Sequence, residues 1–157
     1  STKDEFRQLI AALEENDASA TFYLMEKDST MEPSDLEEFV RKGFDFSVHP
    51  DLPPPSGVTW KDKLSKHIAQ FEERYGRKPA SSVRNHYVVW SGYLGGAKIQ
   101  AALGFEVDSN YMSMPENQRC YMTASGLMMP FVEPNGNVLP IFQLPAQFTK
   151  TTVSDIR

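Results

Sequence analysis

The sequence predicts an α/β fold: an incomplete or distorted (β/α) barrel with mostly parallel strands, and a C-terminal part richer in short strands with a hairpin. Apolar runs of strand length alternate with amphipathic helical stretches, at roughly 20 to 35 residues per unit, which is typical of parallel strands joined by right-handed crossovers. The chain of 157 residues is too short for eight such units, since a full barrel needs about 200 to 250 residues. We therefore expect a single domain over residues 1–157.

Helix and strand patterns alternate through the first half of the chain. The apolar residues of the first stretch recur at the i, i+3, i+4, i+7 spacing of one buried helix face. The next run is continuously apolar, as expected for a strand covered on both faces. Pro33 suits a first helical turn, and Gly43 and Gly76 suit helix ends. The predicted elements are helix 3–15, strand 20–25, helix 33–43, strand 44–48 and helix 59–75.

The second half continues the alternation and then changes character. Gly104 ends a helix, and a short strand follows it and ends at Asp108. Farther on, Pro134-Asn135-Gly136-Asn137 is a strong turn signal and predicts a hairpin. The predicted elements are a strand within 82–89, helix 94–103, strand 105–107, an extended segment at 121–123, and short strands at 131–132, 138–139 and 141–144.

The first helix has no strand before it. In a parallel α/β unit a helix is the crossover between two strands. We therefore expect at least one strand before Ser1, and hence a domain that is truncated at its N-terminus.

Composition excludes several classes of function. The net charge is −5 and the basic residues are scattered, which argues against nucleic acid as the main partner. No apolar run approaches the ~18 residues of a membrane span. The single cysteine, Cys120, excludes an internal disulfide and a multi-cysteine zinc site, and we expect it to be a small buried apolar residue. One cysteine and the lack of a leader pattern favour a cytoplasmic location; the sequence gives no indication of oligomeric state.

Polar residues follow the predicted strands, and in parallel α/β folds the ligand site lies beyond the carboxyl ends of the strands. Two of the three histidines are among them. The residues that we expect at this rim are Glu26, Lys27, His49, Asp51, Arg84, Asn85, His86, Asp108, Asn110 and Tyr111.

His49 and His86 are the candidate metal ligands. A neutral imidazole at His49 could bind a metal or act as a general acid or base, and the alternative is a surface histidine at a loop entry. If 82–89 is a barrel strand, Arg84 and His86 share one face and Asn85 lies on the other. Arg84 could then orient a carboxylate or stabilise an oxyanion. The alternative for this segment is a hydrogen-bond cluster that seals the barrel.

Asp108 is the second candidate catalytic residue, beside Arg84. At a strand end its carboxylate could orient a base or bind a sugar hydroxyl, and the alternative is a loop-initiating Asx turn. Trp90 and Tyr111 could line a sugar-binding groove, although barrel packing explains such aromatic residues equally well. His67 is expected to pack within its helix. The expected substrate contacts are Asp51, Asn85, Trp90, Asn110 and Tyr111.

Several blocks of this sequence resemble those of the polysaccharide deacetylase superfamily of carbohydrate esterases. The blocks are ATFYLM, FSVHPD, FEERYGRKPASSVRNHYVVWSGY and GFEVDSNY, in that order, and the resemblance covers roughly residues 1–150. The likeness is strongest to divergent bacterial members, whose third block reads Arg-Asn-His rather than Arg-Pro-Pro. The resemblance implies a distorted (β/α) barrel that uses a divalent metal, zinc or a similar ion, to hydrolyse N-acetyl or O-acetyl groups of a carbohydrate or other acetylated glycan.

The resemblance carries over residue by residue. His49 matches the first position of a His-x-x-x-His block, whose second position falls on Pro53, which cannot ligate. His86 is our candidate replacement. Arg84 matches the arginine of the third block and Asp108 the acidic residue of the fourth. The first-strand Asp pair and the late catalytic His of the family are absent from this chain, so we expect it to have little or no hydrolase activity alone.

Two other functions remain open. A non-catalytic carbohydrate-binding or scaffold domain with a degenerate deacetylase fold is favoured by the proline at position 53. A protein-interaction domain could use the Met-rich segment 112–129, which holds five of the seven methionines, although packing over the barrel mouth accounts for them equally well.

Overall fold

The computed structural model describes residues 3–27, 31–52, 57–90, 92–110 and 127–145. Helices and strands alternate along the chain as far as β4, and a hairpin follows. In chain order the elements are α1 (Lys3–Glu15), β1 (Thr21–Leu24), α2 (Pro33–Arg41), β2 (Asp45–Val48), α3 (Gly57–Tyr75), β3 (Ser82–Val83), the 3₁₀ turn η1 (His86–Val88), α4 (Gly95–Ala102), β4 (Val107–Asp108), β5 (Met129–Val132) and β6 (Val138–Gln143).

The strands form an open arc in the order β1-β2-β3-β4-β6-β5. β1 pairs with β2 in parallel, and β3, β4 and β6 pair in parallel within a second sheet whose edge strand, β5, is antiparallel to β6. The two sheets are bridged where the backbone N–H of Ala80 donates to the carbonyl of Phe46 at 2.8 Å and the Ser47 hydroxyl donates to the Ala80 carbonyl at 3.1 Å. The described residues therefore form parallel α/β layers and no closed barrel.

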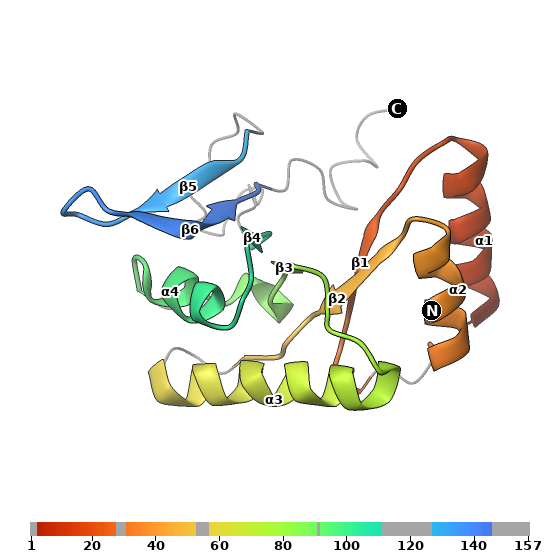
Figure 1. Ribbon diagram of the computed structural model, residues 1–157, viewed down its shortest axis with the longest axis horizontal. Coiled ribbons are helices and arrows are strands. Elements are labelled where there is room, and N and C mark those ends of the chain that lie inside the picture. The colour runs from red at the N-terminus through yellow and green to blue at the C-terminus, as the bar shows by residue number, and fades with distance from the viewer. Residues whose placement is uncertain (1–2, 28–30, 53–56, 91, 111–126, 146–157) are drawn as a thin grey trace.

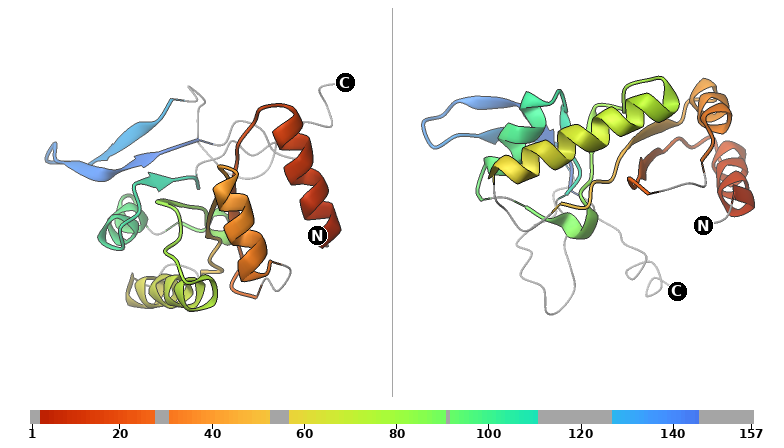
Figure 2. Two further views of the ribbon diagram at one scale, coloured as in Figure 1. Left: turned by 45° about the vertical axis from the view of Figure 1, so that its right-hand side comes forward. Right: turned by 90° about the horizontal axis from the view of Figure 1, so that it is seen from below.

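The helices cover the sheets on one side. Figure 1 shows α1 and α2 side by side against β1 and β2, with α3 running below and the β5–β6 hairpin at the opposite end from α1; the turned views of Figure 2 agree. Alternate residues of β1 and β2 supply the buried face, where the Phe22 and Phe46 rings stack at 5.5 Å and Phe6 of α1 meets Phe22 at 4.7 Å. This aromatic core holds α1 on the sheet.

The predicted alternation, the parallel strands and the hairpin are confirmed, and so is a strand within 82–89. The prediction of two separate short strands at 138–139 and 141–144 is wrong. The segment 82–89 holds a strand of only two residues, because the chain leaves the sheet after Val83 and turns into η1. Near the C-terminus, β6 is one strand over 138–143 and not two short ones. The segment 121–123, together with Cys120 and Tyr111, lies outside the described residues.

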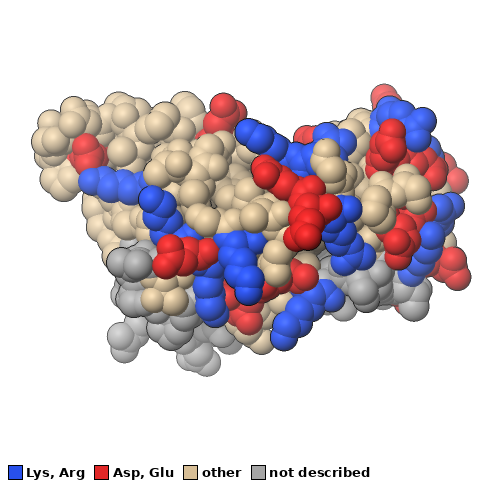
Figure 3. Space-filling model, turned by 60° about the horizontal axis from the view of Figure 1, so that its bottom comes forward, with Lys and Arg blue, Asp and Glu red and all other residues tan. Residues whose placement is uncertain are grey.

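Within the part of the chain that the structure describes, no helix is both long and apolar enough to cross a membrane. On the face shown in Figure 3, lysine and arginine side chains are interspersed with aspartate and glutamate and form no continuous basic surface.

Candidate functional site

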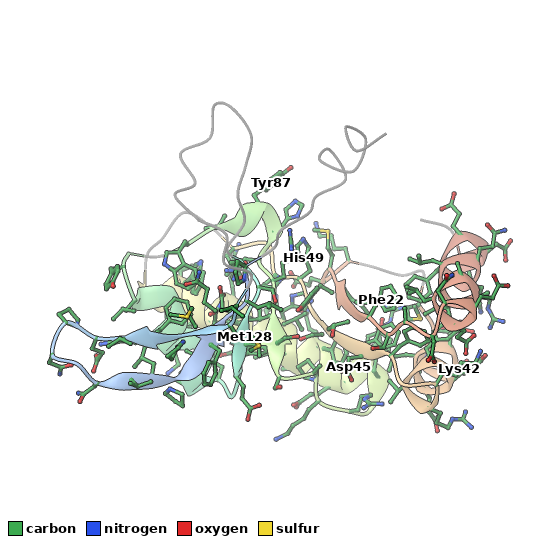
Figure 4. The ribbon with its side chains drawn as sticks, turned by 90° about the horizontal axis from the view of Figure 1, so that it is seen from above. Phe22, Lys42, Asp45, His49, Tyr87 and Met128 are labelled. Carbon is green, nitrogen blue, oxygen red and sulfur yellow. The ribbon has the colours of Figure 1, made fainter. Side chains whose placement is uncertain are left out.

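A pair of histidines lies where the loops after β2 and β3 meet. β2 ends at Val48, and the backbone N–H of His49 still donates to the Leu24 carbonyl of β1 at 2.8 Å. The backbone N–H of His86, at the start of η1, donates to the carbonyl of Pro50 at 2.9 Å. These bonds bring His49 Nε2 to 3.2 Å from His86 Nδ1, with the two rings nearly perpendicular at 82°. Figure 4 shows His49 near the middle of the molecule and Tyr87 projecting outward beyond it.

The tautomer of His49 is set by the backbone. Its Nδ1 lies 2.7 Å from the carbonyl oxygen of Arg84. Because a carbonyl only accepts, Nδ1 carries the proton and Nε2 presents its lone pair toward His86. Burial lowers the pKa of His49 below its ordinary value, although the Arg84 carbonyl opposes this change. His49 is therefore a neutral imidazole whose Nε2 accepts a hydrogen bond from His86 Nδ1.

A buried hydrogen-bond chain holds the neighbouring loops in register. The backbone N–H of Asn85 donates to Asn110 Oδ1 at 2.6 Å, the backbone N–H of Asn110 donates to Asp108 Oδ1 at 3.1 Å, and the Asn110 amide donates to the other Asp108 oxygen. Asp108 is 0% exposed. Burial raises its pKa to about 6, and the amides of Asn110 and Gln100 partly counter that rise. The hydrogen bond from Asn110 N–H to Asp108 Oδ1 forms an Asx turn. This turn is the structural alternative that the sequence left open for Asp108.

The other predicted site residues are divided between the interior and the surface. Asn85 and Asn110 are buried, at 1% and 5% exposed, and the Asn85 amide donates to the Val89 carbonyl. The ring of Trp90 stacks on Phe131 at 5.7 Å and meets Trp60 edge-on, so its surroundings include core packing. The remaining placements are Arg84 half-buried, Asp51 exposed and Tyr111 outside the described residues.

The prediction that Arg84 and His86 share one face of a barrel strand is wrong. They do not alternate along a barrel strand, because β3 ends at Val83. Instead, His86 is brought to His49 by the turn of η1, in which Tyr87 takes a left-handed backbone conformation with φ of +53°. Few non-glycine residues adopt a left-handed backbone conformation, and those that do are often found at functional sites. No pattern in the sequence marks this turn.

The spacing of the two histidine nitrogens suits a shared metal ion. Ligand nitrogens lie about 2.0–2.1 Å from a zinc ion, so two of them in a tetrahedral site are separated by roughly 3.3 Å. The separation of 3.2 Å between His49 Nε2 and His86 Nδ1 fits this requirement. The hydrogen bond from His49 Nδ1–H to the Arg84 carbonyl also fits a metal site, because metal-binding histidines commonly donate their other ring N–H to a carbonyl or carboxylate. Among the described residues, no group of three His, Cys, Asp or Glu side chains is placed to hold an ion.

A cleft next to the histidine pair is lined by two of the expected rim residues, Glu26 and Asp51, and by four residues that were not predicted to belong to a site. The cleft has a volume of about 220 Å³. Three of its residues, Lys63, Lys66 and His67, are three and four positions apart on α3 and so share one helix face, which was the available signal. The cleft is lined by Glu26, Pro50, Asp51, Lys63, Lys66 and His67.

Comparisons with known proteins identify the fold. No family model and no curated protein matches the sequence. Among solved structures, a protein from Mycobacterium smegmatis named as a polysaccharide deacetylase is 18% identical and matches 92% of this chain and 45% of its own length, with a TM-score of 0.64. One from Bordetella bronchiseptica, named as a polysaccharide deacetylase involved in O-antigen biosynthesis, is 16% identical over 92% of this chain and 52% of its own, with a TM-score of 0.56.

A third similar structure is a pseudoenzyme of the CE4 family from Bacillus anthracis. It is 15% identical and matches 69% of this chain and 39% of its own, with a TM-score of 0.55. The chain therefore spans about half the length of the solved structures that it matches. Over the matched part, the fold of this chain is similar to the fold of these solved structures.

Proposed function

We propose that this chain carries part of a metal-dependent carbohydrate deacetylase-like site that acts on N-acetyl or O-acetyl groups of a glycan. The observation that carries the proposal is the pair of facing nitrogens, His49 Nε2 and His86 Nδ1, at 3.2 Å. The likeness of fold to proteins named as polysaccharide deacetylases supports the same reaction class. By itself this chain is expected to have little or no hydrolase activity, because it lacks the Asp pair and the late histidine implied by the sequence resemblance.

His49 and His86 would hold the ion, zinc or a similar divalent metal. Such an ion supplies a Lewis acid for the acetyl carbonyl and a means of activating water. The chain's own contribution is to orient the two imidazoles. The Arg84 carbonyl orients the His49 ring by accepting a hydrogen bond from Nδ1–H, whereas burial favours the neutral form of that ring. The bond from His86 N–H to the Pro50 carbonyl fixes where η1 begins.

Arg84 and Asp108 have different roles in this proposal. The side chain of Arg84 is half-buried beside the pair and is the group that would stabilise negative charge on the acetyl oxygen. Asp108 is completely buried and so acts as a positioning residue: it holds Asn110, which holds the backbone of Asn85 next to His86. Asp51 is exposed after His49 and remains a proposed substrate contact.

A second candidate function is a carbohydrate-binding domain that kept the fold and lost the chemistry. Two observations favour it. The described residues place no third metal ligand beside the histidine pair, and one of the similar solved structures is named as a pseudoenzyme.

Titration with Co²⁺, a spectroscopic substitute for zinc, tests the metal site directly. One ion should bind per chain and give visible absorption, and His49→Asn or His86→Asn should each abolish that absorption. His67→Asn is the matched control, because it removes the remaining histidine and should leave the absorption in place. Unchanged absorption in the first two variants would refute the site.

Glycan binding separates the two functions. The wild-type chain is titrated with chitooligosaccharides, with and without Zn²⁺. The deacetylase proposal expects Zn²⁺ to change the affinity for an acetylated oligosaccharide, and His49→Asn to remove that change. Binding that is identical with and without the ion, in a chain that binds no Co²⁺, would support the non-catalytic domain instead.

A further inference from the structure

The cleft beside the histidine pair contains charges of both signs. Glu26 follows β1 and Asp51 follows β2, while Lys63 and Lys66 come from the first half of α3. All four side chains belong to exposed residues. Among the described residues, none of the four takes part in an ion pair. Two carboxylates and two ammonium groups therefore line one cleft without forming an ion pair with each other.

His67 forms a buried part of the cleft wall. It is 4% exposed, and its Nδ1 has no hydrogen-bond partner among the described atoms. Leaving a buried polar atom unpaired costs about 1–3 kcal/mol. Burial lowers the pKa of His67 below its ordinary value, although the nearby Glu26 carboxylate opposes this change. A neutral imidazole can donate or accept a hydrogen bond.

A second, smaller cavity continues the cleft along α3. It has a volume of about 20 Å³ and shares Glu26 and His67 with the larger one. Gln70 also lines it, and its buried Oε1 lacks a partner among the described atoms as well. The small cavity is large enough for one water molecule, which needs a probe volume of roughly 10–15 Å³. His67 and Gln70 thus both line this smaller cavity.

The size and charge of the cleft restrict what it can bind. The volume of about 220 Å³ is far larger than the 20 Å³ of the one-water cavity, and it leaves room for a ligand of monosaccharide size. Glu26 and Asp51 would repel a purely anionic ligand, and Lys63 and Lys66 would repel a purely cationic one. On the face drawn in Figure 3, acidic and basic side chains are likewise interspersed.

We propose that this cleft binds a small zwitterion of sugar size, with an ammonium group beside Glu26 and Asp51 and a phosphate or carboxylate beside Lys63 and Lys66. His67, which lines the cleft, lies beside the bound ligand. The site is separate from the proposed metal ligands, and it stands whether or not the chain contributes to a deacetylase.

Four sugars that differ only in charge test the proposal. Glucosamine 6-phosphate carries both charges, glucose 6-phosphate and glucosamine carry one each, and glucose carries none. Isothermal titration of the wild-type chain should show glucosamine 6-phosphate binding about tenfold tighter than either singly charged sugar, since each charge-assisted contact contributes on that order. Equal affinities for the four, or no binding of any, would overturn the proposal.

Variants assign each charge to its wall of the cleft. Lys63→Met with Lys66→Met should reduce the affinity for glucosamine 6-phosphate to that for glucosamine, and Glu26→Gln should reduce it to that for glucose 6-phosphate. Lys61→Met and Asp62→Asn are the matched controls, because both residues are exposed on α3 and neither lines the cleft. Equal losses in the controls would contradict the assignment.

One measurement needs no substitution at all. The ¹⁵N resonance of His67 Nδ1 in the wild-type chain should move when glucosamine 6-phosphate is added, whereas the ¹⁵N resonances of His49 should move when Co²⁺ or Zn²⁺ is added. A sugar that shifts His49 and leaves His67 unchanged would place binding at the histidine pair and refute the cleft. Retained Co²⁺ binding in the Lys63→Met, Lys66→Met variant keeps the two sites distinguishable.

Discussion

Replacing Asp108 by Asn should change how the stability of the protein depends on pH. Asp108 is completely buried, and its pKa is about 6 in the folded chain against an ordinary value of 3.8. A tenfold difference in proton affinity corresponds to ~1.4 kcal/mol, so this gap corresponds to roughly 3 kcal/mol. Because the folded-state pKa is the higher one, the native state binds the proton more tightly. The stabilisation is complete below 3.8 and is lost as the pH rises through about 6.

The assay is urea denaturation of the wild type and Asp108→Asn from about pH 4 to pH 7. The quantity to follow is the wild-type unfolding free energy minus that of the variant, which should fall by roughly 3 kcal/mol across this range. Asparagine also places an N–H where Asp108 accepts from the Asn110 amide, but that cost does not depend on pH. Asp62→Asn, at an exposed position of α3, shows the effect of removing one carboxylate from the surface.

A difference that stays flat or rises with pH would refute the reasoning. A flat difference would mean that burial does not set the proton affinity of Asp108. A rising one would mean that its hydrogen bonds with Asn110 outweigh burial and hold the carboxylate charged.

Three further predictions concern the scaffold. Gly96→Ala should lower the unfolding free energy by ~1 kcal/mol in urea denaturation, because the new Cβ would lie 3.0 Å from the ring of Trp90. The cost of this close contact exceeds the gain in helix propensity, and a stabilised variant would show that the ring can move. Phe46→Ala should cost about 3–5 kcal/mol in the same assay, because the ring is 3% exposed within the aromatic core, and a loss below ~1 kcal/mol would contradict its place there. Asp35→Asn should destabilise the protein near neutral pH, because a hydrogen bond from Lys3 lowers the pKa of Asp35; the difference from wild type should vanish as the pH falls below 3.8, and one that persists there would point to packing instead.

Much of the fold could be predicted from local pattern. The heptad-like spacing in 3–15, the apolar run before Met25 and the Asn-Gly turn at 135–136 each depend on a few neighbouring residues, and the structure has a helix, a strand and a hairpin there. The histidine pair was inferred less directly. Parallel strands place their carboxyl ends at one edge, so His49 after β2 and residues just after β3 were expected to lie near each other.

Other features depend on contacts between segments far apart in the chain. The sequence could not show that β3 stops at Val83, because that end is set by the turn into η1 and by the His86 N–H bond to the Pro50 carbonyl. It could not decide between a reactive and a buried Asp108, since the two differ only in what covers the strand end. The helical pattern of 59–75 likewise did not indicate that His67 Nδ1 would be buried without a hydrogen-bond partner among the described atoms.

The amino-acid sequence by itself determined the α/β alternation, the hairpin and the polar residues that follow the strands, because hydrophobic periodicity and turn chemistry act over a few neighbouring positions. Tertiary structure alone decided that His49 and His86 face each other at 3.2 Å, that Asp108 is sealed from solvent, and that α3 closes a cleft against the ends of β1 and β2. The physical reason is that burial, proton affinity and unpaired hydrogen-bonding groups are properties of an environment, which distant segments create together when they pack.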